Sequence, residues 1–582
     1  MTVAAPAASP DQHEADPRRW IALAVVLMAS FMILLDISIV NVAIPRIQAD
    51  LSASFAQIQF VIAGYQLAYA VCLITGGRLG DVFGRKLMFM TGVAGFTIAS
   101  ALCGFAPSAG TLVGARVLQG LMAALMYPQV LSVIQVSFPP RQRAAAFGVF
   151  GGVVGLATIS GPLLGGLLIE ADVLSLGWRP IFLVNVPIGI GAIVAAAVFL
   201  RESRSPAAPR LDLPGVALAS TGLFLLAYPL VEGRDLGWPR WVYLSLMAAA
   251  LVLVVFTLYE RRRSAGQGSP LLDLALFRDR PFVVGSLLAF VFFAGIPAFF
   301  LTFSLFLQIG LDFTALQAGL ATLPFALGSG LASGVSIRLA PRVGKRILQF
   351  GAVALVIGLL ASLAVVRAEG TGLRGYQLIP SLLVTGVGLG LIVAPLITII
   401  LAGIDRSKAG SASGVLTTMQ QIGGALGVAI IGIIFFGALA GHADTSSGEL
   451  SVELRQRLAA ARVEPHLVDS AMASFTRCFR ERSAASDPTA TPHGCPAATP
   501  AVRCDPAPQG PPAVPCITRL AATKARGDNF SHAFQGAILY EIALFVLTFF
   551  LVFLLPRSPA TPRTARPGAP AAAPASSELR PS

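Results

Sequence analysis

Long apolar runs, separated by short polar segments, dominate the chain. Fourteen runs reach the length of about 20 residues that a helix needs to cross the ~30 Å hydrocarbon core of a bilayer. They lie near residues 20–44, 58–76, 87–106, 110–136, 144–169, 180–200, 213–231, 241–259, 281–309, 317–337, 347–366, 377–402, 412–440 and 534–556. The pattern predicts an all-α membrane protein with 14 transmembrane helices, and the even number predicts that both termini lie on one side.

The Lys and Arg residues of the short loops predict which side that is. With the N-terminus in the cytoplasm, the inner loops carry basic clusters such as 261–263 and 342–346. The short outer loops carry only Arg46, Arg179, Arg234, Arg240, Arg367 and Arg374. Because cytoplasmic loops are enriched in Lys and Arg, we expect a multi-pass protein of the cell (cytoplasmic) membrane with both termini cytoplasmic.

Composition supports this interpretation. The chain is 55% hydrophobic and 12% charged, whereas soluble globular domains carry about 25% charged residues. A soluble enzyme, a coiled coil and a disordered scaffold are therefore excluded. The net charge of +13 could indicate nucleic-acid binding, but the basic residues occupy short gaps between apolar runs. We therefore attribute the charge to cytoplasmic loops and expect no nucleic acid among the partners.

One predicted outer loop, residues 441–533, is much longer than the others. We expect one or two amphipathic helices near 448–484, then a Pro-, Ala- and Thr-rich stretch with little apolar core, and a possible extracytoplasmic partner. Four of the six cysteines lie here: Cys478, Cys495, Cys504 and Cys516. An even number of cysteines in an outer segment indicates disulfides. Three pairings are possible, and we favour 478–516 with 495–504. A metal site is the alternative, which the absence of CxxC spacing disfavours.

Two short segments indicate an internal repeat. Gly76 to Lys86 reads GGRLGDVFGRK, and Ile337 to Arg346 reads IRLAPRVGKR. Each follows an outside-to-inside helix, which predicts two parallel six-helix repeats with two helices inserted between them. The expected organisation is a cytoplasmic tail at 1–19, an N-terminal half at 20–200, inserted helices and a cytoplasmic linker at 201–280, a C-terminal half at 281–556 and a disordered cytoplasmic tail at 557–582.

Six motifs, in order, resemble the major facilitator superfamily, specifically its fourteen-helix drug–proton antiporter branch (multidrug efflux type). They are LDISIVNVAIP at 35–45, the loop at 77–86, RVLQG at 116–120, GPLLGG at 161–166, WRPIFLVNVPIG at 178–189 and AGSASGVLTTMQQIGGALG at 409–427. The chain departs from the family pattern at Pro341, which replaces the acid of the first-half loop, and at Met419, where many relatives have Arg. Loop 441–533 is not part of the common pattern.

Three charges inside the predicted helices are candidates for proton coupling: Asp36, Arg116 and Glu541, since a charge in the bilayer indicates function by default. At 1.5 Å per residue, Asp36 lies about 12 Å and Arg116 about 9 Å from the outer ends of their helices, so we expect them at similar depth. A carboxyl group loses its proton readily beside arginine and retains it in apolar surroundings. A movement between these two environments would therefore couple proton transfer to a change of state. The alternative is a fixed ion pair. Glu541 is a second proton site or a merely hydrogen-bonded carboxyl.

The loop between the second and third predicted helices is a candidate conformational latch. Gly77, Gly80 and Gly84 permit a tight turn, and Asp81 suits the positive N-terminal end of a neighbouring helix. The candidate helix start is Gly410–Ser411, and in the family such a contact holds the inside closed. Arg85 and Lys86 belong to the latch and also serve as topology anchors.

Other candidates rest on the resemblance or on polarity within the spans. The resemblance implies an antiporter-type helix that contains Gly161, Pro162, Gly165 and Gly166, although plain helix packing also explains these residues. Polar side chains in spans tend to face the interior. The substrate-cavity candidates are Asn41, Tyr65, Gln66, Tyr127, Gln129, Asn185, Gln420 and Gln421.

We therefore expect a proton-coupled exporter (antiporter) of amphipathic or lipophilic small molecules such as drugs or antibiotics. No cofactor is expected, because the proton gradient supplies the energy and no GxxxxGK[ST] sequence for ATP occurs. HExxH and GxSxG are also absent, so no catalytic or metal residue is assigned and the protein is not expected to be an enzyme. The alternatives are an exporter of an endogenous lipid or metabolite, and a non-transporting membrane receptor or scaffold that uses loop 441–533.

Overall fold

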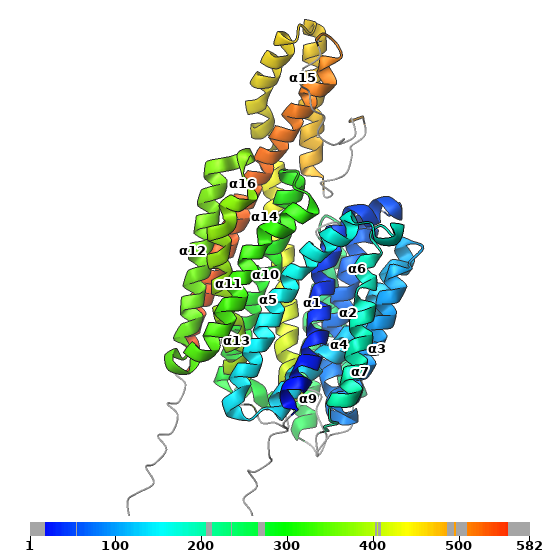
Figure 1. The fold of residues 1–582 in the computed structure, drawn as a ribbon, viewed down its shortest axis with the longest axis vertical. Coiled ribbons are helices and arrows are strands. Elements are labelled where there is room, and N and C mark those ends of the chain that lie inside the picture. Colours follow the sequence, from blue (N-terminus) through cyan, green and yellow to red (C-terminus); the bar gives the residue numbers. More distant parts are fainter. Residues whose placement is uncertain are drawn as a thin grey trace, which may run out of the picture.

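The structure is a computed structural model that describes residues 18–53, 55–204, 212–233, 236–265, 274–401, 404, 409–485, 494–495 and 509–556. Within these residues it is helical throughout and contains no strand (Figure 1). The predicted C-terminal tail and most of the predicted N-terminal tail lie outside the described residues. The all-α class predicted from the apolar runs is confirmed.

Apart from α14 and α16, which are longer than predicted, the helices follow the predicted runs closely. The N-terminal half contains α1 (Arg19–Asp50), α2 (Phe55–Phe83), α3 (Arg85–Gly104), α4 (Ala109–Ser137), α5 (Pro140–Glu170), α6 (Pro180–Leu183) and α7 (Asn185–Phe199). The inserted pair is α8 (Leu213–Glu232) and α9 (Arg240–Ala265). The C-terminal half contains α10 (Arg280–Leu305), α11 (Ala315–Val343), α12 (Arg346–Glu369), α13 (Ile379–Leu401), α14 (Ala409–Ala460), α15 (Pro465–Ala484) and α16 (Ala513–Leu554).

Thirteen helices of the described chain are long and apolar enough to cross a membrane. The fourteenth is α2, which bends by 50° between its segments Phe60–Leu73 and Thr75–Phe83. The two halves pack against each other through α5 with α11 and through α2 with α14. Close approach is possible because a Cβ atom at Gly155 of α5 would lie 3.2 Å from Ser329 Oγ of α11. Small residues allow this kind of contact between membrane helices.

Helices α14 and α16 are much longer than a bilayer requires. With 52 and 42 residues, they extend for about 78 and 63 Å, so both continue beyond the bundle. Together with α15 they form a helical extension, the distal domain (residues 443–485, 494–495 and 509–525), at the end opposite to the start of α1 (Figure 1). The segment expected to be a loop at 441–533 is thus largely helical.

The distal domain has its own apolar core, built from the region expected to form amphipathic helices together with α16, while most of the Pro-, Ala- and Thr-rich stretch lies outside the described residues. Leu450, Leu454 and Leu458 of α14 are buried against Phe475 of α15 and Ile517 of α16. The three leucines recur every four residues and therefore share one helix face. That spacing was visible in the sequence. It was not recognised as a continuation of the same helix because the apolar span before it ends near residue 440.

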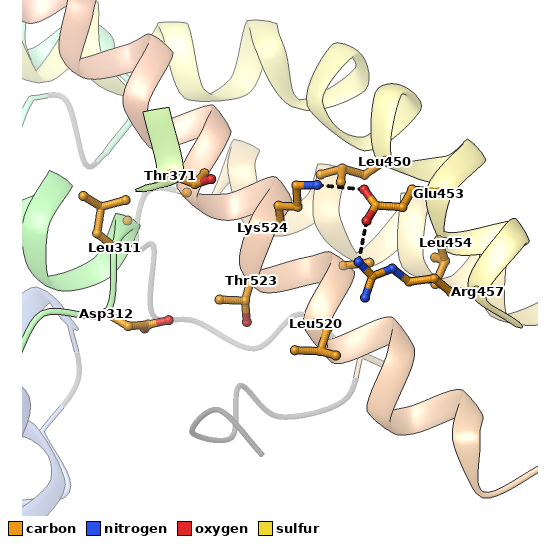
Figure 2. A pocket seen from close by; sticks show the side chains of 13 residues that line it. Leu311, Asp312, Thr371, Leu450, Glu453, Leu454, Arg457, Leu520, Thr523 and Lys524 are labelled. Atoms are coloured by element: carbon orange, nitrogen blue, oxygen red, sulfur yellow. Dashed lines mark hydrogen bonds and ion pairs between the residues drawn. The ribbon is translucent and has the colours of Figure 1, made fainter. Parts of the chain in front are cut away.

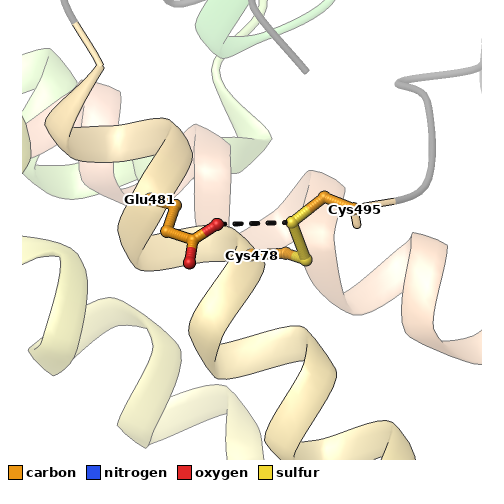
Figure 3. Close-up of a disulfide and its surroundings, with 3 residues drawn as sticks. All are labelled: Cys478, Glu481 and Cys495. Carbon is orange, nitrogen blue, oxygen red and sulfur yellow. Dashed lines mark hydrogen bonds between the residues drawn. A yellow bond between two sulfur atoms is a disulfide. The ribbon is translucent and has the colours of Figure 1, made fainter. Parts of the chain in front are cut away.

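The favoured disulfide pairing, 478–516 with 495–504, was wrong. Cys478 is bonded to Cys495, with 5.6 Å between their Cα atoms (Figure 3). Cys516 is disulfide-bonded as well, and Cys504 lies outside the described residues. Cys478 lies near the C-terminal end of α15, so this bridge closes a short loop of sequence separation 17 rather than the long loop that nested pairing requires.

Candidate functional site

Asp36 and Arg116 form a buried ion pair, so the contact predicted from their depths is confirmed. Arg116 Nη1 on α4 donates to Asp36 Oδ2 on α1. The Asp36 side chain has no exposed surface and Arg116 only 2%. Removing one partner of such a pair costs about 3–5 kcal/mol, because the other charge is left buried and unpaired.

Other donors complete the coordination of the Asp36 carboxylate. Gln119 Nε2 and Asn185 Nδ2 donate to Asp36 Oδ1 over 2.9 and 3.0 Å. Ser100 Oγ on α3 accepts from the same two amides, at 2.6 Å from Gln119 and 3.4 Å from Asn185. Donors from α4 and α7 therefore meet at the carboxylate of α1, and Ser100 of α3 bonds to two of these donors.

The Arg116 guanidinium is held from several sides. Its Nε donates to the carbonyl oxygen of Val61 over 3.0 Å, and its Nη1 also donates to Gln119 Oε1 over 2.6 Å. The guanidinium carbon lies 4.2 Å from the centre of the Tyr65 ring and 5.7 Å from that of Phe182, within the range of cation–π attraction. We call Asp36, Ser100, Arg116, Gln119, Asn185 and Tyr65 the Asp36 network.

Sequence reasoning missed two members of this network. Gln119 lies three residues after Arg116, and residues three apart share a helix face, so this signal was available inside the RVLQG motif. Ser100 carries no comparable signal, because a serine in an apolar helix often bonds only to its own backbone. Tyr65 and Asn185 were predicted as substrate-cavity residues, and the structure places both in the network.

Glu541 on α16 lies in a different environment. Its side chain is fully buried, and neither carboxylate oxygen has a hydrogen-bond partner. A Cβ atom at Gly295 of α10 would lie 2.6 Å from Glu541 Oε2 and 2.8 Å from the Phe545 ring. An ionised carboxylate is very costly in such apolar surroundings, so the carboxyl is favoured in its neutral form.

The predicted latch residue Asp81 has a nearby partner. Its Oδ1 accepts from Arg85 Nη2 over 2.8 Å, and both side chains are buried. Its Oδ2 has no hydrogen-bond partner. The side chains at Gly410–Ser411, the proposed helix start, lie outside the described ones, so the latch contact itself stays a prediction. The helices concerned, α2 and α14, do pack together.

The start of α3 is capped by a residue that the sequence analysis did not identify. The carboxylate oxygens of Glu202, beyond the end of α7, accept from the backbone N–H groups of Lys86 and Leu87 over 3.1 Å each. A Cβ atom at Gly84, which has φ 116°, would overlap the same carboxylate. Lys86 Nζ donates to the carbonyl oxygen of Ala197 over 2.7 Å. This loop is therefore fastened to the end of α7.

Gly77 and Gly80, expected in a loop, lie inside α2 and serve helix packing. A Cβ atom at Gly80 would overlap the Gln129 side chain of α4, and Gln129 Nε2 donates to the carbonyl oxygen of Gly76 over 2.8 Å. Gly77 is buried in the same turn of α2. Gln129, predicted to line the cavity, joins α4 to the C-terminal part of α2.

The glycines of α5 pack against the part of α1 that carries Asp36. A Cβ atom at Gly161 would overlap Ser38 Oγ and lie 2.9 Å from the backbone nitrogen of Ile39. One at Gly165 would lie 2.9 Å from Ile39 Cγ1. Pro162 is inside α5 and Gly166 is buried. The packing interpretation of this motif holds in the structure, and its antiporter meaning stays a prediction.

The other cavity candidates differ in their surroundings, and their assignment to a substrate cavity stays a prediction. Tyr127 is buried between the rings of Tyr69 and Phe150. Gln420 is buried, Gln66 and Gln421 are half-buried, and the side chain of Asn41 lies outside the described ones. A groove of about 350 Å³ runs between Gly152 of α5 and Gly330 of α11, at the contact between the halves.

A further hollow, of about 290 Å³, lies where the distal domain joins the bundle (Figure 2). Leu311 and Leu454 line it, and Glu453 accepts there from both Lys524 and Arg457 over 2.8 and 2.7 Å. Its lining residues are far in the sequence from those of the Asp36 network.

Asp50 ends α1 beyond the apolar span and is half-exposed. Hydrogen bonds from Trp178 Nε1 and from the Arg179 guanidinium, 2.9 and 2.8 Å long, lower the pKa of its carboxyl. It is the exposed counterpart, on the same helix, of the buried Asp36.

Two six-helix halves around buried charges define a polytopic membrane transporter. Residues 26–428 match the family model of the Major Facilitator Superfamily, and the chain belongs to that family. It is therefore a transporter and not an enzyme, as the sequence analysis expected.

Two relatives and one solved structure are particularly similar. The chain is 41% identical to the probable actinorhodin transporter of Streptomyces coelicolor, over 94% of each chain. It is 37% identical to the tetracenomycin C resistance and export protein of Streptomyces glaucescens, over 72% of this chain and 76% of that one. The human organic anion transporter MFSD10 shares the fold, with TM-score 0.52 and 16% identity over 92% of this chain and all of the other.

Proposed function

We propose that this transporter exports amphipathic or lipophilic small molecules, such as drugs or antibiotics, across the cytoplasmic membrane in exchange for protons. The observation that carries the coupling is the Asp36 network, in which a fully buried carboxylate receives donors from Arg116, Gln119 and Asn185. One relative is named for transport of actinorhodin and another for resistance to and export of tetracenomycin C, which favours a small-molecule cargo of this kind.

The network is suited to convert a proton into a change of helix packing. The ionised Asp36 carboxylate holds donors from α4 and α7 against α1. A proton on this carboxyl removes the charge that Arg116 requires, so the three helices lose their common contact. The halves then rock about the α5–α11 and α2–α14 contacts, and cargo leaves as the proton enters.

Glu541 is proposed as a second proton site, in the other half of the molecule. It is buried without a hydrogen-bond partner, so it stays neutral until water or a cation reaches it. The proton sites of the two halves thus start from opposite states, one paired with arginine and the other isolated.

In this proposal both termini are cytoplasmic and the distal domain is extracytoplasmic, where a partner could reach it. The cell membrane is the expected location, and no cofactor takes part. Accessibility of single introduced cysteines to impermeant thiol reagents, in the distal domain and near residue 18, tests this orientation. Labelling of the distal domain from the cytoplasmic side would overturn it.

The test of coupling is the accumulation of tetracenomycin C or actinorhodin, supplied outside as trial cargo, by inside-out vesicles that contain Asp36→Asn. We expect proton-driven uphill transport to be lost while exchange of cargo down its gradient persists, which shows a folded protein. Asp50→Asn, on the same helix but half-exposed, is the matched control and should transport normally.

Uphill transport by Asp36→Asn at the parent rate would exclude Asp36 as the coupling residue. If neither cargo moves but a lipid or metabolite does under a proton gradient, the exporter of an endogenous compound replaces the drug exporter. If the parent protein moves no substrate under a proton gradient, a receptor or scaffold becomes the better interpretation.

A further inference from the structure

Two histidines from distant parts of the chain meet where the distal domain leaves the bundle. His442 is on α14 and His532 on α16, and their ring centres are 5.2 Å apart with 18° between the planes. Both side chains are exposed. The pair therefore joins the two long helices at a surface that a dissolved ion can reach.

Each ring is oriented by its own helix. His442 Nδ1 lies 3.3 Å from the carbonyl oxygen of Ala438, and His532 Nδ1 lies 3.3 Å from that of Asp528. A carbonyl oxygen can only accept, so each contact favours the tautomer with the proton on Nδ1. Nε2 then keeps its lone pair. Metal-binding histidines usually donate their other ring N–H to a carbonyl in this way.

The surroundings are polar and include negative charge. The Asp528 carboxylate lies 3.8 Å from His532 Nδ1 and accepts from Ser446 over 2.9 Å. Two residues beyond His442, Asp444 pairs with Arg480 of α15 over 2.7 Å. This level of the molecule is therefore outside the apolar span, and Asp528 favours a cation nearby.

We propose that His442 and His532 bind one divalent transition-metal ion through their two Nε2 atoms, with water completing the coordination. Imidazole suits Zn²⁺, Cu²⁺ and Ni²⁺, and Cu²⁺ binds most tightly in this series. Metal–nitrogen bonds of about 2.0–2.1 Å require the two nitrogens to approach within about 4 Å. Since the rings are near-parallel with their centres 5.2 Å apart, binding requires both to turn about their Cβ–Cγ bonds until the two Nε2 lone pairs converge.

The site holds two protein ligands. No group of three or more His, Cys, Asp or Glu side chains suited to a metal occurs among the residues that the structure describes. Affinity therefore depends on both imidazoles together, because each alone is an ordinary surface histidine. The bound ion would cross-link α14 to α16 at the junction of bundle and distal domain. The inference does not rest on the Asp36 network.

The test is Cu²⁺ titration of the full-length protein in detergent, after removal of any polyhistidine tag, read by electron paramagnetic resonance. One Cu²⁺ per protein with two imidazole nitrogens is expected. His442→Ala and His532→Ala should each weaken binding at least about tenfold, since even indirect partners of metal ligands have effects of this size. His466→Ala is the matched control, because His466 is an exposed histidine of α15, and it should bind as the parent does.

Thermal unfolding provides a second measurement. An ion that binds the folded protein raises the unfolding midpoint, so Cu²⁺ should stabilise the parent and His466→Ala but not the other two variants. His442→Gln and His532→Gln repeat the test with polar replacements. Equal Cu²⁺ binding by all variants, or no saturable binding by the parent, would overturn the proposal. Either result leaves the Asp36→Asn experiment unaffected.

Discussion

The Asp36 carboxylate divides its two oxygens among three donors, and this division makes the individual residues testable. Arg116 occupies Oδ2, while Gln119 and Asn185 share Oδ1. Gln119 has the widest role, because it also accepts from Arg116 over 2.6 Å and donates to Ser100 over 2.6 Å. It orients both members of the ion pair.

Gln119→Ala should slow proton-driven efflux without abolishing it. The substitution removes one donor from the ionised Asp36, and a hydrogen bond to a charged group contributes about 1.5–3 kcal/mol. Arg116 and Asn185 still hold the carboxylate. The measurement is the initial rate of uphill transport, normalised to the amount of inserted protein. Gln349→Ala, at a half-buried glutamine of α12, is the control, and an equal loss of rate in both variants would contradict the role assigned to Gln119.

At the scale of helices, glycines set how closely α5 approaches its neighbours. Gly161 lies against the backbone of Ile39 on α1, whereas a Cβ atom at Gly152, on the same helix, would meet nothing within 4 Å. Two glycines of one helix therefore have different structural requirements. The difference allows a paired experiment on α5.

Gly161→Ala should destabilise the protein by about 1–3 kcal/mol, the usual cost of overpacking, and reduce efflux because it displaces the segment of α1 that carries Asp36. Gly152→Ala should change neither property, since its added methyl group meets open space. Thermal unfolding in detergent and transport rates compare the two variants. Equal behaviour would show that α1 and α5 are less closely packed than described.

The carboxylate of Glu202 joins the end of α7 to the start of α3. Its charge opposes the positive N-terminal end of α3, a contact that contributes about 0.3–1 kcal/mol at an exposed site. Glu202→Gln keeps the shape and removes the charge. We expect Glu202→Gln to lower the free energy of unfolding by an amount within this range. The effect should be smaller at high salt, which screens the charge. The neighbouring Arg201→Gln serves as control, and a larger effect there would argue against the cap.

The helices and the Asp36–Arg116 contact were predictable because membrane helices are regular, so counting residues gives depth. The role of Glu202 was not predictable. It contacts Lys86, 116 positions away in the sequence, and no local sequence pattern indicates such a contact. Tyr127 and Gln129 were assigned to a cavity from polarity alone, but a buried polar group also finds partners in ordinary helix packing. Polarity therefore identified interior residues without distinguishing the Asp36 network from its surroundings.

For the whole molecule, the distal domain raises the question of what its disulfides contribute. Apolar contacts among Leu454, Leu458, Phe475 and Ile517 already join its three helices. The bond from Cys478 to Cys495 instead ties the chain that follows α15 to the end of that helix.

Cys478→Ser with Cys495→Ser should leave transport largely intact and make the segment after α15 easier to cut with protease. The physical reason is that a disulfide mainly restricts the unfolded or loose chain, while the Asp36 network lies elsewhere. Limited proteolysis and transport assays provide the measurements. Cys72→Ser, at a half-buried free cysteine, is the control, and loss of transport only in the double variant would link the distal domain to the cycle.

Helix α14 runs without interruption from the contact with α2 into the distal domain. About 18 of its residues lie beyond His442, which corresponds to about 27 Å. A stiff rod of that length is a lever arm, so a tilt of roughly 10° where it leaves the bundle would displace its tip by roughly 5 Å. The position of the distal domain should therefore report, in amplified form, which way the C-terminal half is tilted.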